Sequence, residues 1–282
     1  MTQPPTWLLS FQANVYSQAG EDGVIEKILE LLPERNLWCV EFGAWDGILY
    51  SNTRSLIVNK KYSAVLIESD SEKFKDLQRN CSAYPEVISI NRFVGFYTYD
   101  HLDVILEATP VPEDFDFLSI DIDGNDYHVW KAIERYQPKV VCVEFNPTIP
   151  TELNFVQSAA ESVNQGSSLM ALTELGVEKG YELVSVLPFN AIFVRSEYFP
   201  IFEISDNSPS TLRTHTQAIT YMFSGYDGRI ILRGHRRNDW HDIEIIEDDI
   251  QILPKFLQKY PLNYNGVERF LFNLLYKKHR KK

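Results

Sequence analysis

Up to about residue 195, short apolar runs alternate with segments whose apolar residues recur at helical spacing. This alternation is typical of a mostly parallel sheet with helices on both faces. The apolar runs predict strands over residues 37–42, 64–67, 87–90, 115–120, 140–144, 181–186 and 191–194. The segments between them predict helices over residues 24–32, 51–58, 71–80, 101–108, 126–135 and 169–179. The pattern therefore predicts an α/β fold with a Rossmann-like sheet.

The pattern changes near residue 195. Pro188-Phe189-Asn190 separates the last two predicted strands, which have the spacing of an antiparallel hairpin. Beyond Arg195 the α/β alternation stops. We therefore predict a principal domain over residues 1–195 and a C-terminal elaboration over residues 196–282. The elaboration holds too many aromatic and apolar residues for a disordered tail, so we expect it to pack on the sheet or on a second subunit.

Composition and charge narrow the classes of partner. The formal net charge of -12 argues against nucleic-acid binding, which requires a surplus of Lys and Arg. No apolar segment is long enough to span a bilayer, and residues 1–9 lack the positive cluster of a signal peptide. Cys39, Cys81 and Cys142 form neither a disulfide framework nor a zinc motif, which indicates a reducing compartment and predicts a cytoplasmic protein. The basic run at residues 277–282 is expected to be a solvated tail, with contact to a membrane surface or polyanion as the alternative.

A glycine-containing turn follows the first predicted strand. In an open α/β sheet, ligands bind beyond the carboxyl ends of the strands, and glycines there let the backbone approach a ligand closely. Gly43 and Gly47 have Gly-x-x-x-Gly spacing, which disfavours NAD and ATP because neither dinucleotide nor phosphate-loop spacing is present. Glu68 ends the second predicted strand, where a carboxylate can accept hydrogens from both hydroxyls of a ribose. Together these residues predict a nucleoside-containing ligand at this edge.

Acidic side chains follow the fourth and fifth predicted strands. Asp121 and Asp123 come directly after one strand, and Glu144 and Asn146 lie at the end of the next. Oxygen ligands of this kind suit a hard cation such as Mg²⁺, so Asp121, Glu144 and Asn146 are our predicted metal ligands. The alternative for Asp123 and Asp126 is structural, because Asp-Gly favours a turn and Asp126 is placed to cap the next helix.

Other candidates lie outside this edge. His215, in the C-terminal elaboration, is a possible catalytic residue that could reach a substrate, and no serine or cysteine nucleophile motif is present. Arg233, Arg236 and Arg237 with His235 form a local basic cluster. We expect a solvated loop there, with binding of an acidic substrate as the alternative.

In this order, the motifs resemble those of the FkbM-type methyltransferases of the class I fold. The resemblance covers residues 17–194. It is carried by Ser17-Gln18-x-Gly20-Glu21-Asp22, Glu41-Phe42-Gly43-Ala44-x-Asp46-Gly47, Glu68 and Asp121-Ile122-Asp123-Gly124-x-Asp126. It implies a seven-stranded sheet, with S-adenosylmethionine lying over the first two strands. The residues that it implies for cofactor binding are Ser17, Gln18, Glu41, Gly43, Ala44, Asp46, Gly47 and Glu68.

The resemblance also bears on the chemistry, because such families mostly methylate oxygens of sugars, lipids or natural products. We therefore expect O-methylation of a small or carbohydrate-like acceptor, with Asp121, Asp123 and His215 as catalytic candidates and the C-terminal elaboration helping to form the acceptor pocket. Asp123 and Asp126 depart from the family pattern, in which Glu is commoner. The layout of Asp121, Glu144 and Asn146 is similar to that of metal-dependent O-methyltransferases. N-methylation of an amine, a non-catalytic module that keeps the fold, and a homo-oligomer remain open.

Overall fold

The computed structural model describes residues 3–277, and the chain divides into two units, Met1–Thr216 and Gln217–Lys282. The division falls later in the chain than the boundary that the sequence predicts after residue 195. Its physical reason is that Phe202, Ile204 and Leu212 are buried in the core of the first unit, so residues 196–216 continue that unit. Residues 278–282 of the predicted basic tail lie outside the described residues.

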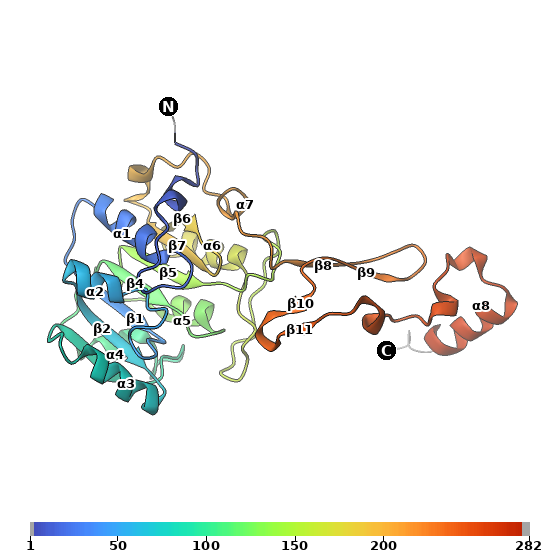
Figure 1. The fold of residues 1–282 in the computed structure, drawn as a ribbon, viewed down its shortest axis with the longest axis horizontal. Helices are drawn as coiled ribbons and strands as arrows, with labels where there is room; N and C mark the ends of the chain where they lie inside the picture. The colour runs from blue at the N-terminus through green and yellow to red at the C-terminus, as the bar shows by residue number, and fades with distance from the viewer. Residues whose placement is uncertain (1–2, 278–282) are drawn as a thin grey trace. The chain divides into compact units, whose positions relative to one another are not determined.

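A seven-stranded sheet forms the centre of the first unit (Figure 1). Its strand order is β3-β2-β1-β4-β5-β7-β6, and only β7 runs antiparallel to its neighbours. The strands are β1 (Trp38–Phe42), β2 (Ser63–Glu68), β3 (Val87–Asn91), β4 (Phe117–Ile120), β5 (Val140–Glu144), β6 (Tyr181–Val186) and β7 (Asn190–Arg195). The predicted α/β, Rossmann-like fold is therefore confirmed, including its C-terminal hairpin.

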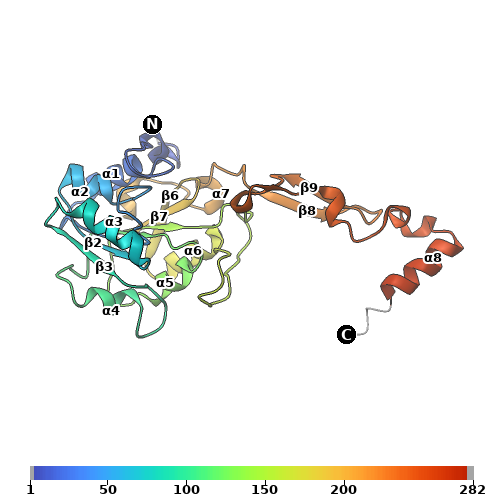
Figure 2. The ribbon, with the colours of Figure 1, turned by 60° about the horizontal axis from the view of Figure 1, so that its bottom comes forward.

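Helices cover both faces of this sheet. Figure 2 shows α1, α2 and α3 on one face and α4, α5 and α6 on the other. The helices are α1 (Glu21–Leu31), α2 (Arg54–Lys60), α3 (Ser71–Cys81), α4 (Leu102–Leu106), α5 (Asp126–Ala132), α6 (Leu169–Glu178) and α7 (Pro209–Leu212). Two 3₁₀ turns accompany them, at Trp7–Phe11 and Phe199–Phe202. No helix within residues 3–277 is long and apolar enough to cross a membrane.

Side-chain caps begin the helices that flank the sheet. Asp70 begins α3, and its carboxylate accepts hydrogen bonds from the backbone N–H groups of Glu72 and Lys73 at 2.8 and 2.9 Å. Ser168 begins α6 in the same way, accepting from the N–H of Ala171 at 3.1 Å. These bonds satisfy donors that the first helical turn leaves without partners. Gly180, just beyond α6, adopts φ +81°, the left-handed conformation that commonly ends a helix.

An ion pair is buried at the amino ends of the central strands. Lys139 precedes β5, and its ammonium nitrogen lies 2.6 Å from the carboxylate of Asp116, which precedes β4. Both side chains are nearly inaccessible to solvent. Asp116 also accepts hydrogen bonds from the backbone N–H groups of Asn36 and Leu37 at 3.0 and 2.9 Å. The pair therefore ties the entry of β1 to β4 and β5, at the opposite edge from the candidate site.

The second unit consists of two-stranded ribbons followed by short helices. A hairpin is formed by β8 (Thr220–Ser224) and β9 (Ile230–Gly234), and a short ribbon by β10 (Arg237–Asn238) and β11 (Ile243–Glu244). The last α-helix, α8 (Gly266–Phe272), begins with a capping box from Asn265 and Glu268. Such local hydrogen bonds give the unit its order, since few of its side chains are buried.

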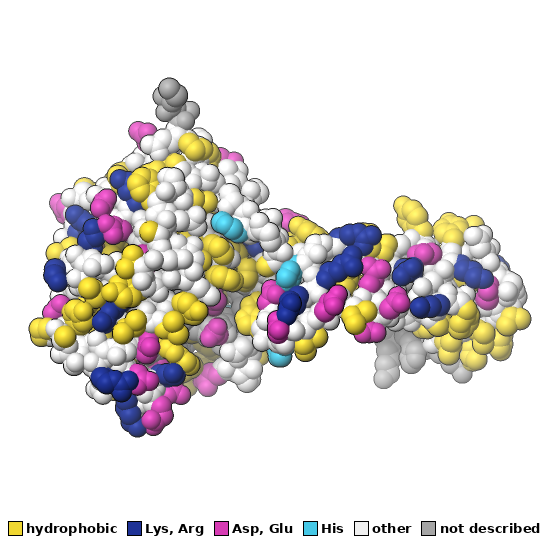
Figure 3. Space-filling model, viewed as in Figure 1, with side chains coloured by type: hydrophobic (Ala, Val, Ile, Leu, Met, Phe, Trp, Pro, Cys, Tyr) yellow, Lys and Arg dark blue, Asp and Glu magenta, His cyan; other side chains and the backbone are white. Residues whose placement is uncertain are grey.

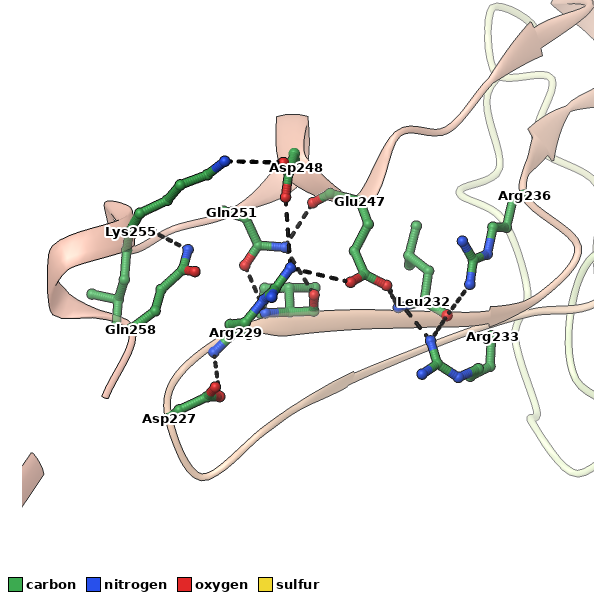
Figure 4. A network of polar contacts seen from close by, with 12 residues as sticks. Asp227, Arg229, Leu232, Arg233, Arg236, Glu247, Asp248, Gln251, Lys255 and Gln258 are labelled. Atoms are coloured by element: carbon green, nitrogen blue, oxygen red, sulfur yellow. Dashed lines mark hydrogen bonds and ion pairs between the residues drawn. The ribbon is translucent and has the colours of Figure 1, made fainter. Parts of the chain in front are cut away.

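A network of charged side chains crosses this unit (Figure 4). The Glu247 carboxylate accepts from the N–H of Leu232 at 3.0 Å and lies within 3.7 Å of the guanidinium groups of Arg229 and Arg233. In the predicted basic cluster, Arg237 pairs with Asp242 and His235 contacts Asp239. Acidic partners therefore offset most of that cluster.

Candidate active site

The parallel strands β1, β2, β4 and β5 end at one edge of the sheet, and the predicted site residues lie there. Because β1 lies between β2 and β4, the loop after β1 is adjacent to both neighbouring strand ends. In open α/β sheets this edge is where ligands bind.

The loop after β1 depends on glycine at two positions. Gly43 and Gly47 both have φ +72°, and Trp45 between them has φ +49°. A Cβ added at Gly43 would lie 1.9 Å from the backbone oxygen of Asp121, which no packed structure tolerates. Gly43 therefore lets this loop approach the end of β4, so that the predicted cofactor loop and the acidic residues share one site.

Glu68 is held in place by the same loop. It is buried at the end of β2, where Oε2 accepts from the backbone N–H of Trp45 at 2.8 Å and Oε1 from that of Asp70 at 2.7 Å. Each carboxylate oxygen can accept more than one hydrogen bond, so acceptor capacity remains for a vicinal diol. The carboxylate is thus oriented by backbone donors before any ligand binds.

Three carboxylates converge beside this loop. One oxygen from each of Asp121, Asp123 and Glu144 can be chosen so that all three lie within 4.8 Å of one another. Burial raises the pKa values of Asp121 and Glu144 well above the usual carboxyl range, and the neighbouring carboxylates raise them further. Asp123 is exposed, whereas Asp121 and Glu144 are partly buried, and oxygen donors of this kind suit a hard divalent metal.

Comparison with protein families decides the class of this site. Residues 84–183 match the model of the methyltransferase FkbM domain. This part of the chain is similar to the FkbM-type methyltransferases. The matched range runs from just before β3 into β6 and includes Asp121, Asp123 and Glu144, whereas the glycine loop and Glu68 precede it. The protein is thus a methyltransferase of the S-adenosylmethionine-dependent class, as the sequence motifs predict.

Solved structures that are similar to this chain include several methyltransferases. M. capricolum TrmK in complex with S-adenosylhomocysteine is 9% identical with a TM-score of 0.38, over 61% of this chain and 67% of that one. An Aquifex aeolicus methyltransferase is 13% identical with a TM-score of 0.38, over 68% and 97%. The N-terminal domain of EvdMO1, determined with S-adenosylhomocysteine and D-fucose, is 12% identical with a TM-score of 0.43, over 62% and 82%. A search of curated proteins gave no significant match.

Some residues that are predicted to bind the cofactor also hold the loop after β1 in place. The buried carboxylate of Glu41 accepts from the hydroxyls of Ser51 and Thr53, both at 2.6 Å, and from the N–H of Asn52 at 2.8 Å. Its pKa is raised by burial, although these bonds oppose the rise. Glu41 therefore anchors the segment that leads into α2, through contacts that begin ten residues away in the sequence.

Two further members of that loop are also occupied within the chain. Ala44 is buried and donates its N–H to the oxygen of Ile67 at 3.1 Å. Asp46 uses Oδ1 to accept from the N–H groups of Ile48 and Leu49 at 2.9 and 2.8 Å. Both residues fix the path of the loop, and its glycines make the close approach.

The segment before α1 is held by a reciprocal contact. The Asp22 carboxylate accepts from the backbone N–H of Ser17 at 2.7 Å, and the Ser17 hydroxyl accepts from the N–H of Asp22 at 3.0 Å. Gln18 is exposed next to this bond. Ser17 is thus committed to the loop structure, while the side chain of Gln18 remains accessible.

Asn146, the third predicted metal ligand, closes a turn with its side chain. Its amide oxygen accepts from the N–H and hydroxyl of Thr148 at 2.9 and 2.7 Å, and its amide nitrogen donates to the oxygen of Gln165 at 2.7 Å. These bonds engage both ends of the amide in the local turn, and its role as a metal ligand stays a prediction. The structure also brings Asp123, a predicted catalytic residue, together with Asp121 and Glu144.

Asp126 and His215 both make local hydrogen bonds within the chain. Asp126 does not cap α5; its carboxylate accepts from the N–H groups of Ile122 and Gly124, both at 2.9 Å, and so holds the acidic loop. Burial raises the pKa of Asp126 to about 6. The recorded hydrogen bonds of His215 are to Arg213 and Thr214, and none among the described residues links it to the carboxylate cluster.

Proposed function

We propose that this methyltransferase transfers the methyl group of S-adenosylmethionine to a hydroxyl of a small or carbohydrate-like acceptor, assisted by a divalent cation. The observation that carries the proposal is the convergence of the Asp121, Asp123 and Glu144 carboxylates beside the Gly43 loop. This arrangement supports a cation at the end of the cofactor site where a reacting oxygen would lie.

The cofactor site is proposed at the ends of β1 and β2. Gly43 would let the methionine part approach the backbone, and Glu68 would accept the ribose hydroxyl hydrogens. The orientation of Glu68 by the N–H groups of Trp45 and Asp70 supports this role, because the carboxylate need not reorganise on binding. Gln18 is retained as a cofactor candidate because its side chain is exposed.

The cation would favour ionisation of the acceptor hydroxyl during methyl transfer. The acceptor oxygen attacks the methyl carbon, the carbon–sulfur bond breaks, S-adenosylhomocysteine leaves, and the hydroxyl proton passes to a base. Carboxylates near the acceptor hydroxyl would oppose its ionisation, whereas a divalent cation lowers its pKa. Without a cation, Asp121 would itself be the general base, and its raised pKa suits that alternative.

The acceptor class is inferred from the surroundings of the site. Trp45 after β1, and Tyr97 and Tyr99 after β3, are exposed on loops that follow strand ends, and the two tyrosine rings are stacked. Aromatic faces combined with a few polar groups are typical of small-molecule sites. The cysteines Cys39, Cys81 and Cys142 are free and buried, which is consistent with a cytoplasmic enzyme.

For the C-terminal unit we propose oligomerisation. Val267, Phe270 and Leu274 are exposed on one side of α8 and its continuation, and Figure 3 shows hydrophobic side chains gathered on this unit. Residues 217–282 contain 12 Lys and Arg against 8 Asp and Glu, whereas the whole chain has a formal charge of -12. Because the first unit is acidic and the second basic, the charges of two copies are complementary.

Calorimetry with S-adenosylhomocysteine tests the cofactor site. Glu68→Ala should weaken binding by about 1–3 kcal/mol, because ligand hydroxyls lose their acceptor. Glu72→Ala, an exposed acid on α3, is the matched control and should bind as the wild type does. Wild-type affinity in Glu68→Ala would remove Glu68 from the site.

The metal is tested by turnover over a panel of hydroxyl and amine acceptors. For a hydroxyl acceptor, activity should fall steeply in EDTA and return with Mg²⁺ or Mn²⁺. Full activity in EDTA would favour Asp121 as a metal-free base. Turnover of amines alone would indicate N-methylation, and cofactor binding without any turnover would indicate a binding module.

A further inference from the structure

Asn190 lies opposite Glu144 across the junction of β5 and β7, which are neighbours in the sheet (Figure 1). The backbone N–H of Phe145 donates to the oxygen of Phe189 at 2.9 Å, so Phe145 and Phe189 form the hydrogen-bonded pair. The adjacent pair, Glu144 and Asn190, is then of the non-hydrogen-bonded kind, in which side chains lie close together on one face of the sheet. The Asn190 side chain is thus on the face where Glu144 meets the acidic cluster.

The amide of Asn190 is oriented by Glu21. Its Nδ2 donates to Oε1 of Glu21 at 3.2 Å, and Oε2 of Glu21 accepts from the N–H of Ala19 at 2.7 Å. Because an ionised carboxylate can only accept hydrogen bonds, the amide must present its nitrogen to Glu21. Its oxygen therefore points away from Glu21.

That oxygen is left without a partner. Asn190 is 5% exposed, and its Oδ1 is buried with no hydrogen-bond partner among the described residues. Leaving a buried polar atom unpaired costs free energy, so such an atom calls for a ligand, a cation or a water. Here the unpaired atom is a neutral oxygen on the residue that pairs in register with Glu144, a member of the carboxylate cluster.

We propose that Oδ1 of Asn190 is the neutral oxygen ligand of a divalent cation held by Asp121, Asp123 and Glu144, and that Glu21 is its positioning residue. This inference rests on the cation in the proposed function. Three carboxylates already exceed the charge of a divalent ion, and an amide oxygen adds a ligand without further repulsion. Asn190 thus takes the amide role that the sequence suggested for Asn146.

The test uses the full chain and Mn²⁺ as the probe, with binding followed by electron paramagnetic resonance. Asn190→Ala should weaken Mn²⁺ binding about 10- to 100-fold, the range found when partners of a metal site are removed. Asn146→Ala is the matched control: it also removes an amide from this edge, but one whose oxygen is occupied, so Mn²⁺ affinity should change less than about threefold. S-adenosylhomocysteine affinity should stay near the wild-type value in both variants.

Exchanging donor and acceptor between Asn190 and Glu21 tests whether Glu21 positions Asn190 or has only a general structural role. Asn190→Asp alone places a second carboxylate next to that of Glu21, and the two charges repel each other. The Mn²⁺ affinity of this variant should therefore fall and depend steeply on pH. Adding Glu21→Gln supplies a donor to that aspartate, and the double variant should regain Mn²⁺ affinity to within a few-fold of the wild type. This rescue also decides the case if Asn190→Ala does not fold.

The outcomes distinguish the proposals. Wild-type protein that binds S-adenosylhomocysteine but no Mn²⁺ would overturn this inference and the cation, leaving the methyltransferase intact. If Asn190→Ala binds Mn²⁺ as tightly as the wild type does, the role of Asn190 as a ligand is overturned, but the cation is not. A water would then be the partner of Oδ1. A double variant that stays as weak as Asn190→Asp would remove the positioning role of Glu21.

Discussion

Replacing Gly43 by alanine tests whether the close approach of the β1 loop to β4 is required. At φ +72° an alanine is strained by about 1–2 kcal/mol, partly offset by the reduced freedom of the unfolded chain. The new Cβ would also lie 1.9 Å from the backbone oxygen of Asp121, so one of two sheet-bonded segments must move by more than an ångström. Such overpacking adds about 1–3 kcal/mol, which gives an expected loss of about 3 kcal/mol.

Gly180→Ala is the matched control. Gly180 has φ +81°, but a Cβ there meets nothing within 4 Å, so only the conformational strain remains and the loss should be about 1 kcal/mol or less. The free energy of unfolding is measured for both variants by urea denaturation followed by circular dichroism. Because the clash displaces Asp121, Gly43→Ala should also weaken binding of Mn²⁺ and S-adenosylhomocysteine. If Gly43→Ala costs no more stability than Gly180→Ala does, the close approach is not a constraint.

Three further predictions follow from buried charge and exposed apolar surface. Lys139→Met should lower the free energy of unfolding by about 3–5 kcal/mol in urea denaturation, because it leaves the Asp116 carboxylate buried without its ion-pair partner. Adding Asp116→Asn should recover part of that loss. A loss below about 1 kcal/mol would contradict this prediction. The raised pKa of Asp121 means that the folded state binds its proton more tightly than the unfolded state does. In EDTA, stability should therefore fall as pH rises from the ordinary carboxyl range through the raised pKa, and Asp121→Asn should reduce that slope in thermal melts; an unchanged slope would contradict it. Phe270→Ser with Leu274→Ser should convert an oligomer to a monomer in light scattering, and a monomeric wild type would refute that interface.

The strand ends could be read from the sequence because their signals are local. Apolar runs mark where each strand stops, so the sequence predicts that Glu68, Asp121 and Glu144 lie at one edge of the sheet. Parallel strands then bring these positions together as a consequence of topology. Gly43 was recognised for the same reason, since a glycine directly after a strand signals close approach.

Tertiary structure alone decided what each polar side chain does at that edge. Glu41 is occupied by a segment ten residues away, and Asn146 by its own turn, while Asn190 arrives from a hairpin some 45 residues after Glu144. Such hydrogen bonds depend on which segments meet in space and on which atoms remain unpaired, and neither spacing nor residue type encodes that. The boundary at Thr216 also depends on tertiary structure, because Phe202 and residues after it are buried in the core that the sheet forms.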